Sequence, residues 1–511
     1  MGFFSRKPKQ PKADSSLTNS TSTASFNSAT SRGLSNNRIS AGSILTPATP
    51  LSPMSAVKIP KIDLPRPPDP QLDPAGYLRS LGAVRDRSKV ILDKALKNQL
   101  NHFDVDMTKM SDVSIFVSGL IKRDYEAPFT GIPGHGRYQH FSVGGKDRVA
   151  DLLASWPESV DNTERCRRLI DLFLISVLLD AGAGTQWSYK SKENGKTYRR
   201  SEGLAVASLE MYNTGLFSGN PSNKFQVDKV GLQALTVDKI AQGTQAGPGN
   251  ELAGLEGRTE LLVRLGNALE EKTEYFGVDG RPGNMIDHLL SHPSTQASSI
   301  LIVPLPVLWN VLMNGLAPIW PPSRTAMNGV SLGDAWPCQA MPKSGSNSWE
   351  SILPFHKLTQ WLTYSLMQPM QSLLNMHFAG TELLTGLPEY RNGGLFVDLG
   401  LLTLKPDDTE RGLANYSDWC RRTGTKGIEV APMFEPSDDV IVEWRGVTVG
   451  LLDVLCEEVN KALKNELAGN EMTLAQLLEA GSWKGGREIA EINRPNTKEP
   501  PILIDSDGTV F

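Results

Sequence analysis

Residues 381–402 combine side chains capable of acid–base chemistry with residues that bend the chain. This mostly apolar run contains Glu382, Glu389 and Arg391, while Pro388 and several glycines interrupt any continuous helix. Burying a carboxylate or a guanidinium costs free energy unless the group is paired or has a function. The run therefore predicts either a ligand-binding or catalytic turn, or a structural Glu–Arg ion pair that braces a helix-turn-strand junction.

Four further segments place polar residues on Gly/Pro turns, mostly beside a tryptophan: residues 180–187, 280–284, 320–324 and 333–336. Polar groups on tight turns next to an aromatic ring are typical of small-ligand sites. Asp180 ends a predicted buried helix, where the helix dipole disfavours a carboxylate, so we expect it to have a partner or a function. Trp187 fits equally well as the wall of a site or as core.

Several motifs with known chemistry are missing from the sequence. Gly182 and Gly184 lack the preceding strand and the third glycine of a dinucleotide fingerprint, and there is no P-loop. His288 and His292 lack the glutamate of a His-Glu-x-x-His site, and no Gly-x-Ser-x-Gly elbow of a serine hydrolase occurs. We expect neither a metal ion nor another cofactor.

The composition describes an ordinary soluble chain. A formal net charge of -4 with 21% charged residues gives no basic excess, so we expect no nucleic-acid partner. The four cysteines lie far apart and predict reduced core thiols, which is consistent with a cytoplasmic or nuclear location. The best candidate for a membrane span, residues 300–320, is interrupted by three prolines, so no span is expected.

The elements that position these residues are mainly helices. Residues 1–73 are rich in Ser, Thr, Asn and Pro and predict a disordered tail, because they cannot bury enough apolar surface. Beyond it, apolar residues at helical spacing or in long runs predict helices over residues 84–100, 166–179, 201–217, 227–242, 255–276, 355–376 (with a kink at Pro369) and 451–467.

Strand signals are fewer. Residues 395–404 are short and apolar, and residues 440–444 with 447–450 predict a hairpin that turns at Arg445 and Gly446. Strands and helices do not alternate, so no doubly wound sheet is expected. The predicted fold class is predominantly α-helical, an α+β protein with a few short strands and a hairpin. Residues 74–511 are predicted to form one large unit of two closely packed lobes, since no linker composition interrupts them.

Five long strings of the sequence resemble the fungal and bacterial uracil catabolism protein 4 family. They cover residues 134–141, 281–288, 319–325, 333–338 and 383–394. The resemblance spans nearly everything from residue 74 onward. It implies a role in a route of uracil degradation that opens the pyrimidine ring through a ribosylated intermediate and ends in urea and a three-carbon acid.

A second, shorter resemblance concerns residues 355–360, 382–385, 389–391 and 399–402, which are similar in order and spacing to the queuosine salvage proteins. Those are helical, DNA-glycosylase-like N-glycosidases that release a base from a nucleoside 5'-monophosphate. The resemblance implies a DNA-glycosylase-like helical core and the cleavage of an N-glycosidic bond. In that family an aspartate precedes the Tyr-Arg pair, whereas this chain has Glu389, which is one methylene longer.

The two resemblances together assign roles to the candidate residues. Cleavage of an N-glycosidic bond develops oxocarbenium character, which a buried carboxylate can stabilise while a carboxylate also takes a proton from water. Glu389 is the expected catalytic carboxylate, with Asp180 as the second. The expected substrate-binding residues are Lys357 and Arg391 for a 5'-phosphate, Glu382 or Asp334 (or Asp180 itself) for sugar hydroxyls or urea, Trp187 or Trp336 as a wall, and Tyr390 and Arg324.

The resulting hypothesis is an N-glycosidase that hydrolyses a ribosylurea, or its 5'-phosphate, to urea and the sugar. Its partner would be this small ribosylated breakdown product of a pyrimidine. One alternative is a phosphoribosyltransferase-type enzyme of uracil metabolism, although such enzymes ordinarily use a parallel sheet. The other is a non-catalytic scaffold that binds enzymes of the uracil degradation pathway.

Overall fold

A computed structural model describes residues 62–505, except for residues 185, 298–299, 346–347 and 426. The chain divides into a unit of residues 1–47 and a unit of residues 48–511, and every described residue belongs to the second. Most of the predicted tail, residues 1–61, lies outside the described residues. The first helix begins at Pro74, where the Asp73 side chain accepts a hydrogen bond from the Gly76 N–H.

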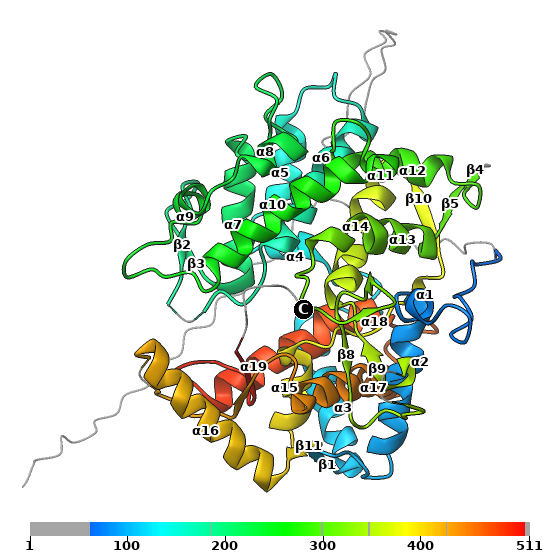
Figure 1. Ribbon diagram of the computed structural model, residues 1–511, viewed down its shortest axis with the longest axis vertical. Coiled ribbons are helices and arrows are strands. Elements are labelled where there is room, and N and C mark those ends of the chain that lie inside the picture. The colour runs from blue at the N-terminus through cyan, green and yellow to red at the C-terminus, as the bar shows by residue number, and fades with distance from the viewer. Residues whose placement is uncertain (1–61, 185, 298–299, 346–347, 426, 506–511) are drawn as a thin grey trace, which may run out of the picture. The chain divides into compact units, whose positions relative to one another are not determined.

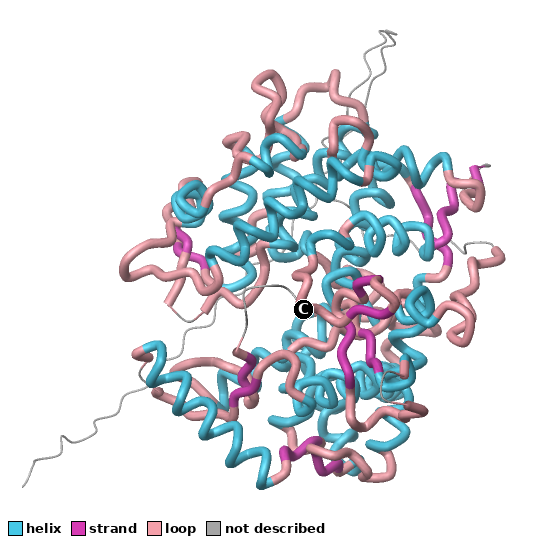
Figure 2. Tube along the Cα trace, viewed as in Figure 1, coloured by secondary structure: helices cyan, strands magenta, loops and turns pink. Residues whose placement is uncertain are grey.

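Helices make up most of the described structure, as Figures 1 and 2 show. The first ten are α1 (Pro74–Leu78), α2 (Leu81–Ala95), α3 (Met110–Asp124), α4 (Arg137–Phe141), α5 (Arg148–Ser155), α6 (Asn162–Leu178), α7 (Arg200–Asn213), α8 (Lys229–Gln233), α9 (Val237–Thr244) and α10 (Leu255–Glu271). The others are α11 (Thr273–Phe276), α12 (Met285–Ser291), α13 (Leu305–Gly315), α14 (Lys357–Leu374), α15 (Tyr390–Asp398), α16 (Pro406–Thr423), α17 (Asp439–Ala462), α18 (Leu474–Leu477) and α19 (Trp483–Asn493). The predominantly helical fold class is confirmed.

The strands are short and form small separate sheets. They are β1 (Phe103–Val105), β2 (Tyr189–Lys190), β3 (Thr197–Tyr198), β4 (Gln296–Ala297), β5 (Leu301–Pro304), β6 (Ala326–Met327), β7 (Val330–Ser331), β8 (Ala335–Pro337), β9 (Ile352–Pro354), β10 (Met376–Ala379), β11 (Leu402–Leu404), β12 (Met433–Phe434) and β13 (Leu503–Ile504). In the one three-stranded sheet among the described residues, β5 pairs in parallel with β10 and antiparallel with β4. The parallel register joins Met376 to Leu301 and Ala379 to Pro304.

One hydrophobic core joins helices from the two ends of the sequence. α14 packs on α6, α15 packs on α19, and α17 packs on α2 and α3. Figure 1 shows α2, α3 and α17 together in one part of the unit and α6, α7 and α10 in another. A single cluster of buried apolar residues runs through all of these helices, from Leu81 to Ile502. This packing brings the start of α14, the end of α6 and the start of α15 into one region.

The predicted hairpin at residues 440–450 is wrong, because these residues form the first half of α17. All of these residues are buried, including the charged Glu443 and Arg445 among β-branched and apolar neighbours, and a fully buried helix cannot be distinguished from a strand by periodicity. The Asp438 side chain caps the helix by accepting a hydrogen bond from the Val440 N–H. Gly446 lies inside the helix, where an added Cβ would be 2.7 Å from Leu353 Cδ2.

The predicted strand at residues 395–404 is also wrong over most of its length. Residues 395–398 belong to α15, and only Leu402–Leu404 form a strand, β11, which pairs with β1. The predicted helix over residues 227–242 is divided into α8 and α9, because Thr236 caps a new helix at that point. The other helix predictions correspond to α2, α6, α7, α10 with α11, α14 and the second half of α17.

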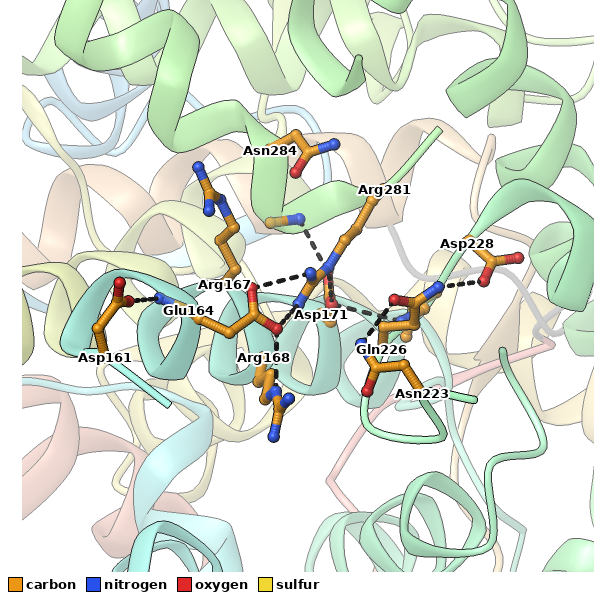
Figure 3. Close-up of polar contacts among 12 residues, drawn as sticks. Asp161, Glu164, Arg167, Arg168, Asp171, Asn223, Gln226, Asp228, Arg281 and Asn284 are labelled. Atoms are coloured by element: carbon orange, nitrogen blue, oxygen red, sulfur yellow. Dashed lines mark hydrogen bonds and ion pairs between the residues drawn. The ribbon is translucent and has the colours of Figure 1, made fainter. Parts of the chain in front are cut away.

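The Gly280–Asn284 loop, predicted from sequence as a ligand-binding turn, is instead fastened to α6 (Figure 3). Arg281 Nε donates to Asp171 Oδ2 (2.7 Å), and the Gly283 N–H donates to Asp171 Oδ1 (2.8 Å). Arg281 also forms an ion pair with Glu164, which lies on α6 before Asp171. Burial raises the pKa of Asp171 to about 6 despite the opposing charge of Arg281. The polar groups of this loop are therefore used in packing.

Candidate functional site

Glu389 is the N-cap of α15, and its carboxylate is held at the helix N-terminus. Its two oxygens accept hydrogen bonds from the backbone N–H groups of Arg391 (2.8 Å) and Asn392 (2.5 Å). The residue is only half-buried, so part of its surface remains available to a ligand. Burial raises the pKa of Glu389 above its ordinary value of 4.5, although these hydrogen bonds and the charges of Lys357 and Arg391 oppose the change. The carboxylate is thus rigidly placed and more basic than usual.

Lys357 is the first residue of α14, and its ammonium belongs to the same pocket. Its backbone N–H donates to Asp334 Oδ2 (3.0 Å), but within the described part of the chain its side chain makes no hydrogen bond or ion pair. Burial lowers the pKa of Lys357, and the strongest opposing influence is the charge of Glu389, followed among the carboxylates by Asp180. The two catalytic candidates and this lysine therefore lie within electrostatic reach of one another.

Asp180 directly follows α6 and is held by a buried arginine. Its Oδ2 accepts a hydrogen bond from Arg137 Nη1 (2.5 Å), and the two side chains are 3% and 0% exposed. The partner expected for a carboxylate at this helix end is thus Arg137, on α4. Oδ1 of Asp180 makes no hydrogen bond with any residue that the structure describes. Asp180 therefore keeps one oxygen without a hydrogen bond to the described residues, and its charge acts on Lys357.

Sequence reasoning missed the group of side chains behind Asp180. Arg137 Nη1 also donates to His140 Nδ1 (3.1 Å), and the Arg137 guanidinium lies over the ring of Trp361, 5.5 Å from its centre. The signal was present, because the string of residues 134–141 concentrates His, Arg and Tyr around glycines. The sequence analysis used residues 134–141 only for the family resemblance and assigned them no chemical role.

Tyr390 and Arg391 extend the pocket toward the C-terminal part of the chain. The Arg391 guanidinium lies 5.2 Å from the Tyr390 ring centre, and Nη1 donates to the Lys498 carbonyl (2.9 Å). Arg200 Nη2 donates to the same carbonyl (3.3 Å). Two guanidinium groups thus meet at one carbonyl oxygen. Arg391 was expected from the sequence to bind a 5'-phosphate. One of its N–H donors instead binds the backbone carbonyl of Lys498.

Asp334, Trp336 and Arg324 form a separate, largely buried arrangement. Asp334 accepts bidentate hydrogen bonds from Arg445 (2.8 and 2.7 Å) and a third from Trp336 Nε1 (2.7 Å). Although burial alone would raise the pKa of Asp334, the charge and hydrogen bonds of Arg445 lower it. Arg324 lies over the Trp336 ring, 4.8 Å from its centre. The Asp334 carboxylate therefore supports the pocket by fixing the start of α14, through the Lys357 N–H, and has little capacity left for a substrate.

Glu382 and Trp187 lie away from the pocket. Glu382 is exposed on the short 3-10 helix η5 (Thr381–Leu383), where its carbonyl oxygen accepts a hydrogen bond from Arg85. Trp187 is 1% exposed and belongs to a second apolar cluster, and its Nε1 donates to the Thr244 carbonyl (3.0 Å). The structure thus brings together Glu389, Lys357, Asp180, Tyr390 and Arg391 but not these two residues.

Other kinds of site receive no support among the residues that the structure describes. They contain no group of three or more His, Cys, Asp or Glu side chains suited to a metal ion. All four cysteines are free, as predicted, and two of them, Cys166 and Cys338, are buried. No helix within the described ranges is long and apolar enough to cross a membrane. A cavity of about 440 Å³ beside Cys338, Lys343 and Asp439 shares no residue with the Glu389 pocket.

The fold and this group of residues define a class of protein: a predominantly helical protein with a half-buried carboxylate of raised pKa, an ammonium that has no hydrogen-bond partner among the described residues, and an Asp–Arg pair within electrostatic reach. Such a pocket suits a small polar ligand and can move a proton at a fixed position.

Comparison with known proteins identifies the family. The model of a family described as "Protein of unknown function (DUF1688)" matches residues 77–511. The chain is 45% identical to Uracil catabolism protein 4 of Lachancea kluyveri over 446 residues, which cover 86% of this chain and 99% of that protein. It is also 45% identical to Protein urg3 of Schizosaccharomyces pombe over 435 residues, 85% of this chain and 98% of that protein. The chain belongs to the uracil catabolism protein 4 family.

Proposed function

We propose that this protein is an N-glycosidase of uracil catabolism that hydrolyses a ribosylurea, or its 5'-phosphate, to urea and the free sugar. The name of the relative from Lachancea kluyveri supports the pathway. The observation that carries the reaction is the Glu389 carboxylate, half-buried, of raised pKa and fixed by two backbone N–H groups opposite Lys357. A general base requires this combination of rigidity, basicity and access.

In the proposed reaction, a water oxygen attacks the anomeric carbon while the bond from that carbon to the urea nitrogen breaks. The bonding electron pair stays on the nitrogen, which takes up a proton from solvent and leaves as part of urea, while Glu389 later returns to solvent the proton that it took from the attacking water. Glu389 takes a proton from the attacking water, and its negative charge stabilises the oxocarbenium character of the sugar in the transition state. No cofactor is consumed, and the atoms balance with one water per substrate.

The other residues of the pocket bind and orient the substrate. Lys357 supplies a cation for the sugar hydroxyls or for a 5'-phosphate. Asp180 uses its available oxygen Oδ1 to accept a hydrogen bond from the departing ureido group. Tyr390 and Arg391 hold the wall of the pocket next to Glu389 and fasten residue 498 against it.

The phosphoribosyltransferase alternative is not supported by the fold. That chemistry ordinarily uses a diphosphate-binding loop at the edge of a parallel sheet, whereas the largest sheet among the described residues has three short strands. A helical pocket with a fixed carboxylate is better suited to hydrolysis.

The first experiment incubates purified protein with ribosylurea, its 5'-phosphate, uridine and uridine monophosphate, and follows urea, uracil and sugar by mass spectrometry. We expect urea from one or both ureides. Glu389→Gln should lower turnover by about a hundred- to ten-thousand-fold, because the amide oxygen keeps one of the two cap hydrogen bonds of α15 but the amide cannot take a proton. Glu410→Gln, an exposed change on α16, is the matched control and should retain wild-type turnover. If none of the four compounds yields a product, the hydrolase is excluded and the non-catalytic scaffold becomes the preferred hypothesis.

A further inference from the structure

Three side chains in mutual contact behind Asp180 each carry a buried hydrogen-bond donor that has no partner among the described residues. The donors are Arg137 Nη2, His140 Nε2 and Trp361 Nε1. Arg137 contacts both other side chains, and the rings of His140 and Trp361 are 5.9 Å apart between centres. The three residues are 0%, 5% and 6% exposed. Native proteins rarely leave buried donors unpaired, and three in one cluster require an explanation.

The tautomer of His140 follows from its neighbour. Arginine nitrogens only donate, so the contact from Arg137 Nη1 makes His140 Nδ1 the acceptor and places the proton of the neutral ring on Nε2. Burial, together with the nearby charge of Arg137, lowers the pKa of His140 and keeps the ring neutral. All three unpaired atoms are therefore donors, and the cluster as a whole lacks an acceptor.

Asp180 adds a hydrogen-bond acceptor to this cluster of donors. Its Oδ2 is bound by the same arginine, while Oδ1 can still accept a hydrogen bond. A ligand that fills both needs must present a carbonyl oxygen to the donors and an N–H to the carboxylate. An uncharged amide group, –CO–NH–, does both, whereas a cation of donors only or an anion of acceptors only satisfies one side.

We propose that Arg137, His140 and Trp361 form, with Asp180, a recognition subsite for an uncharged amide or ureide group. The identification of this group with the leaving group of the reaction rests on the proposed function, but the subsite itself does not. The three donors bind the carbonyl oxygen, and Asp180 Oδ1 accepts from the amide nitrogen.

Access to the subsite is by way of Trp483. Its ring is only half-buried and packs on His140, with ring centres 5.3 Å apart, while Arg487 lies on the ring and pairs with Glu202. Trp483 directly follows a π-helical turn, η6 (Leu478–Ser482), whose Glu479 binds His135 Nδ1 (2.7 Å) beside His140. Single π-turns occur frequently at functional sites, because they aim side chains out of helical register. The ligand reaches the donors past this ring.

The test uses two planar molecules of the same shape, urea and guanidinium, with the full-length protein. Ligand-observed saturation-transfer NMR at non-denaturing concentrations measures binding of urea, acetamide, guanidinium and acetate. Urea and acetamide should bind, while guanidinium, which has no acceptor, should bind at least about ten-fold more weakly. Guanidinium binding as tight as urea would overturn the proposal, since it would show an acidic pocket without carbonyl recognition. No binding of urea or acetamide would overturn it as well.

Two matched variants locate the binding. Trp361→Phe removes the indole N–H while it keeps an aromatic ring, and should weaken urea binding about five- to ten-fold. Trp156→Phe makes the same change at another buried tryptophan with an unpaired Nε1, packed on Phe225 instead, and should bind urea like wild type. Equal urea affinity of Trp361→Phe and wild type, with both folded by circular dichroism, would overturn the proposal. Urea binding that depends on Trp361, without cleavage of any ribosylurea, would sustain the subsite and reject the N-glycosidase.

Discussion

At the scale of single residues, the same carboxylate chemistry gives three different results in this protein. Asp334 is saturated by Arg445 and Trp336, so its pKa is lowered and its function is structural. Asp171 is also paired, but full burial raises its pKa to about 6. Glu389 has only backbone donors, no ion-pair partner at contact distance among the described residues, and is half-buried. Of the three, Glu389 combines a raised pKa with access to a ligand.

The raised pKa of Glu389 predicts the acid side of the pH–rate profile. A general base works only when deprotonated, so kcat should fall as the pH is lowered through a midpoint above the ordinary value of 4.5. Measurement of initial rates of urea release between pH 4 and pH 8 checks this prediction. The residual activity of Glu389→Gln should not show this fall of kcat at low pH. If the fall persists in the variant with the same midpoint, another group is the base.

At the scale of elements, buried or half-buried ion pairs fix the helices that carry the pocket. Asp334 joins the loop before β8, the start of α14 and the middle of α17, through the Lys357 N–H and Arg445. His102, just before β1, joins α16 to α17, because its Nδ1 and Nε2 contact Asp408 and Asp439, each at 2.8 Å. These pairs are made between residues far apart in sequence.

Breaking the Asp334–Arg445 pair should destabilise the protein strongly. Asp334→Asn leaves the Arg445 guanidinium buried without its carboxylate, which typically costs about 3–5 kcal/mol. Urea denaturation followed by fluorescence measures the change in the free energy of unfolding. The double variant Asp334→Leu/Arg445→Met should recover much of the loss, because it removes both charges. A loss below about 1 kcal/mol for Asp334→Asn would show that the pair is not structurally important.

The His102 bridge predicts a loss of stability at alkaline pH. Burial alone would lower the pKa of His102, but the hydrogen bonds to Asp439 and Asp408 outweigh it and raise the pKa from 6.5 to about 9. The folded state thus binds the proton more tightly than the unfolded chain. The bridge contributes fully below pH 6.5 and loses its contribution as the pH rises toward 9, by up to about 3 kcal/mol.

Chemical denaturation at pH 6, 7.5 and 9.5 measures this effect. The comparison is His102→Gln, which cannot carry the charge and should lose less stability than wild type between the first and last pH. Parallel pH profiles of the two proteins would contradict the assignment to His102.

At the scale of the whole molecule, the pocket depends on a hydrophobic core that is formed by segments far apart in the sequence. Glu389, Lys357 and Asp180 lie at the ends of three helices, α15, α14 and α6, which are fixed by one apolar cluster. The family match begins at residue 77. The residues of the site lie on α4 or from Asp180 onward. Every side chain of the site as described therefore lies within the residues that the family model matches.

Removal of residues 1–61 should therefore leave both stability and turnover nearly unchanged. We expect a change in Tm of less than about 2 °C and kcat within about two-fold of the full chain. Differential scanning calorimetry and the urea-release assay check the two quantities. A large loss of Tm would show that the amino-terminal segment packs on the folded unit.

Local sequence was enough to predict the helical class, the long helices such as α6, α10 and α14, and the placing of the charged Glu389 and Asp180 in largely apolar surroundings. These follow from local periodicity and from the cost of burying charge. Residues 440–450 were misassigned as strands, because a helix segment buried on all sides has no exposed polar face to reveal its period. Residues 395–398 were misassigned because so short an apolar run does not distinguish a helix from a strand. The partners of the buried charges were decided only by tertiary structure. Asp180 meets Arg137 and Asp334 meets Arg445 through packing between segments 43 and 111 residues apart, which no local pattern encodes.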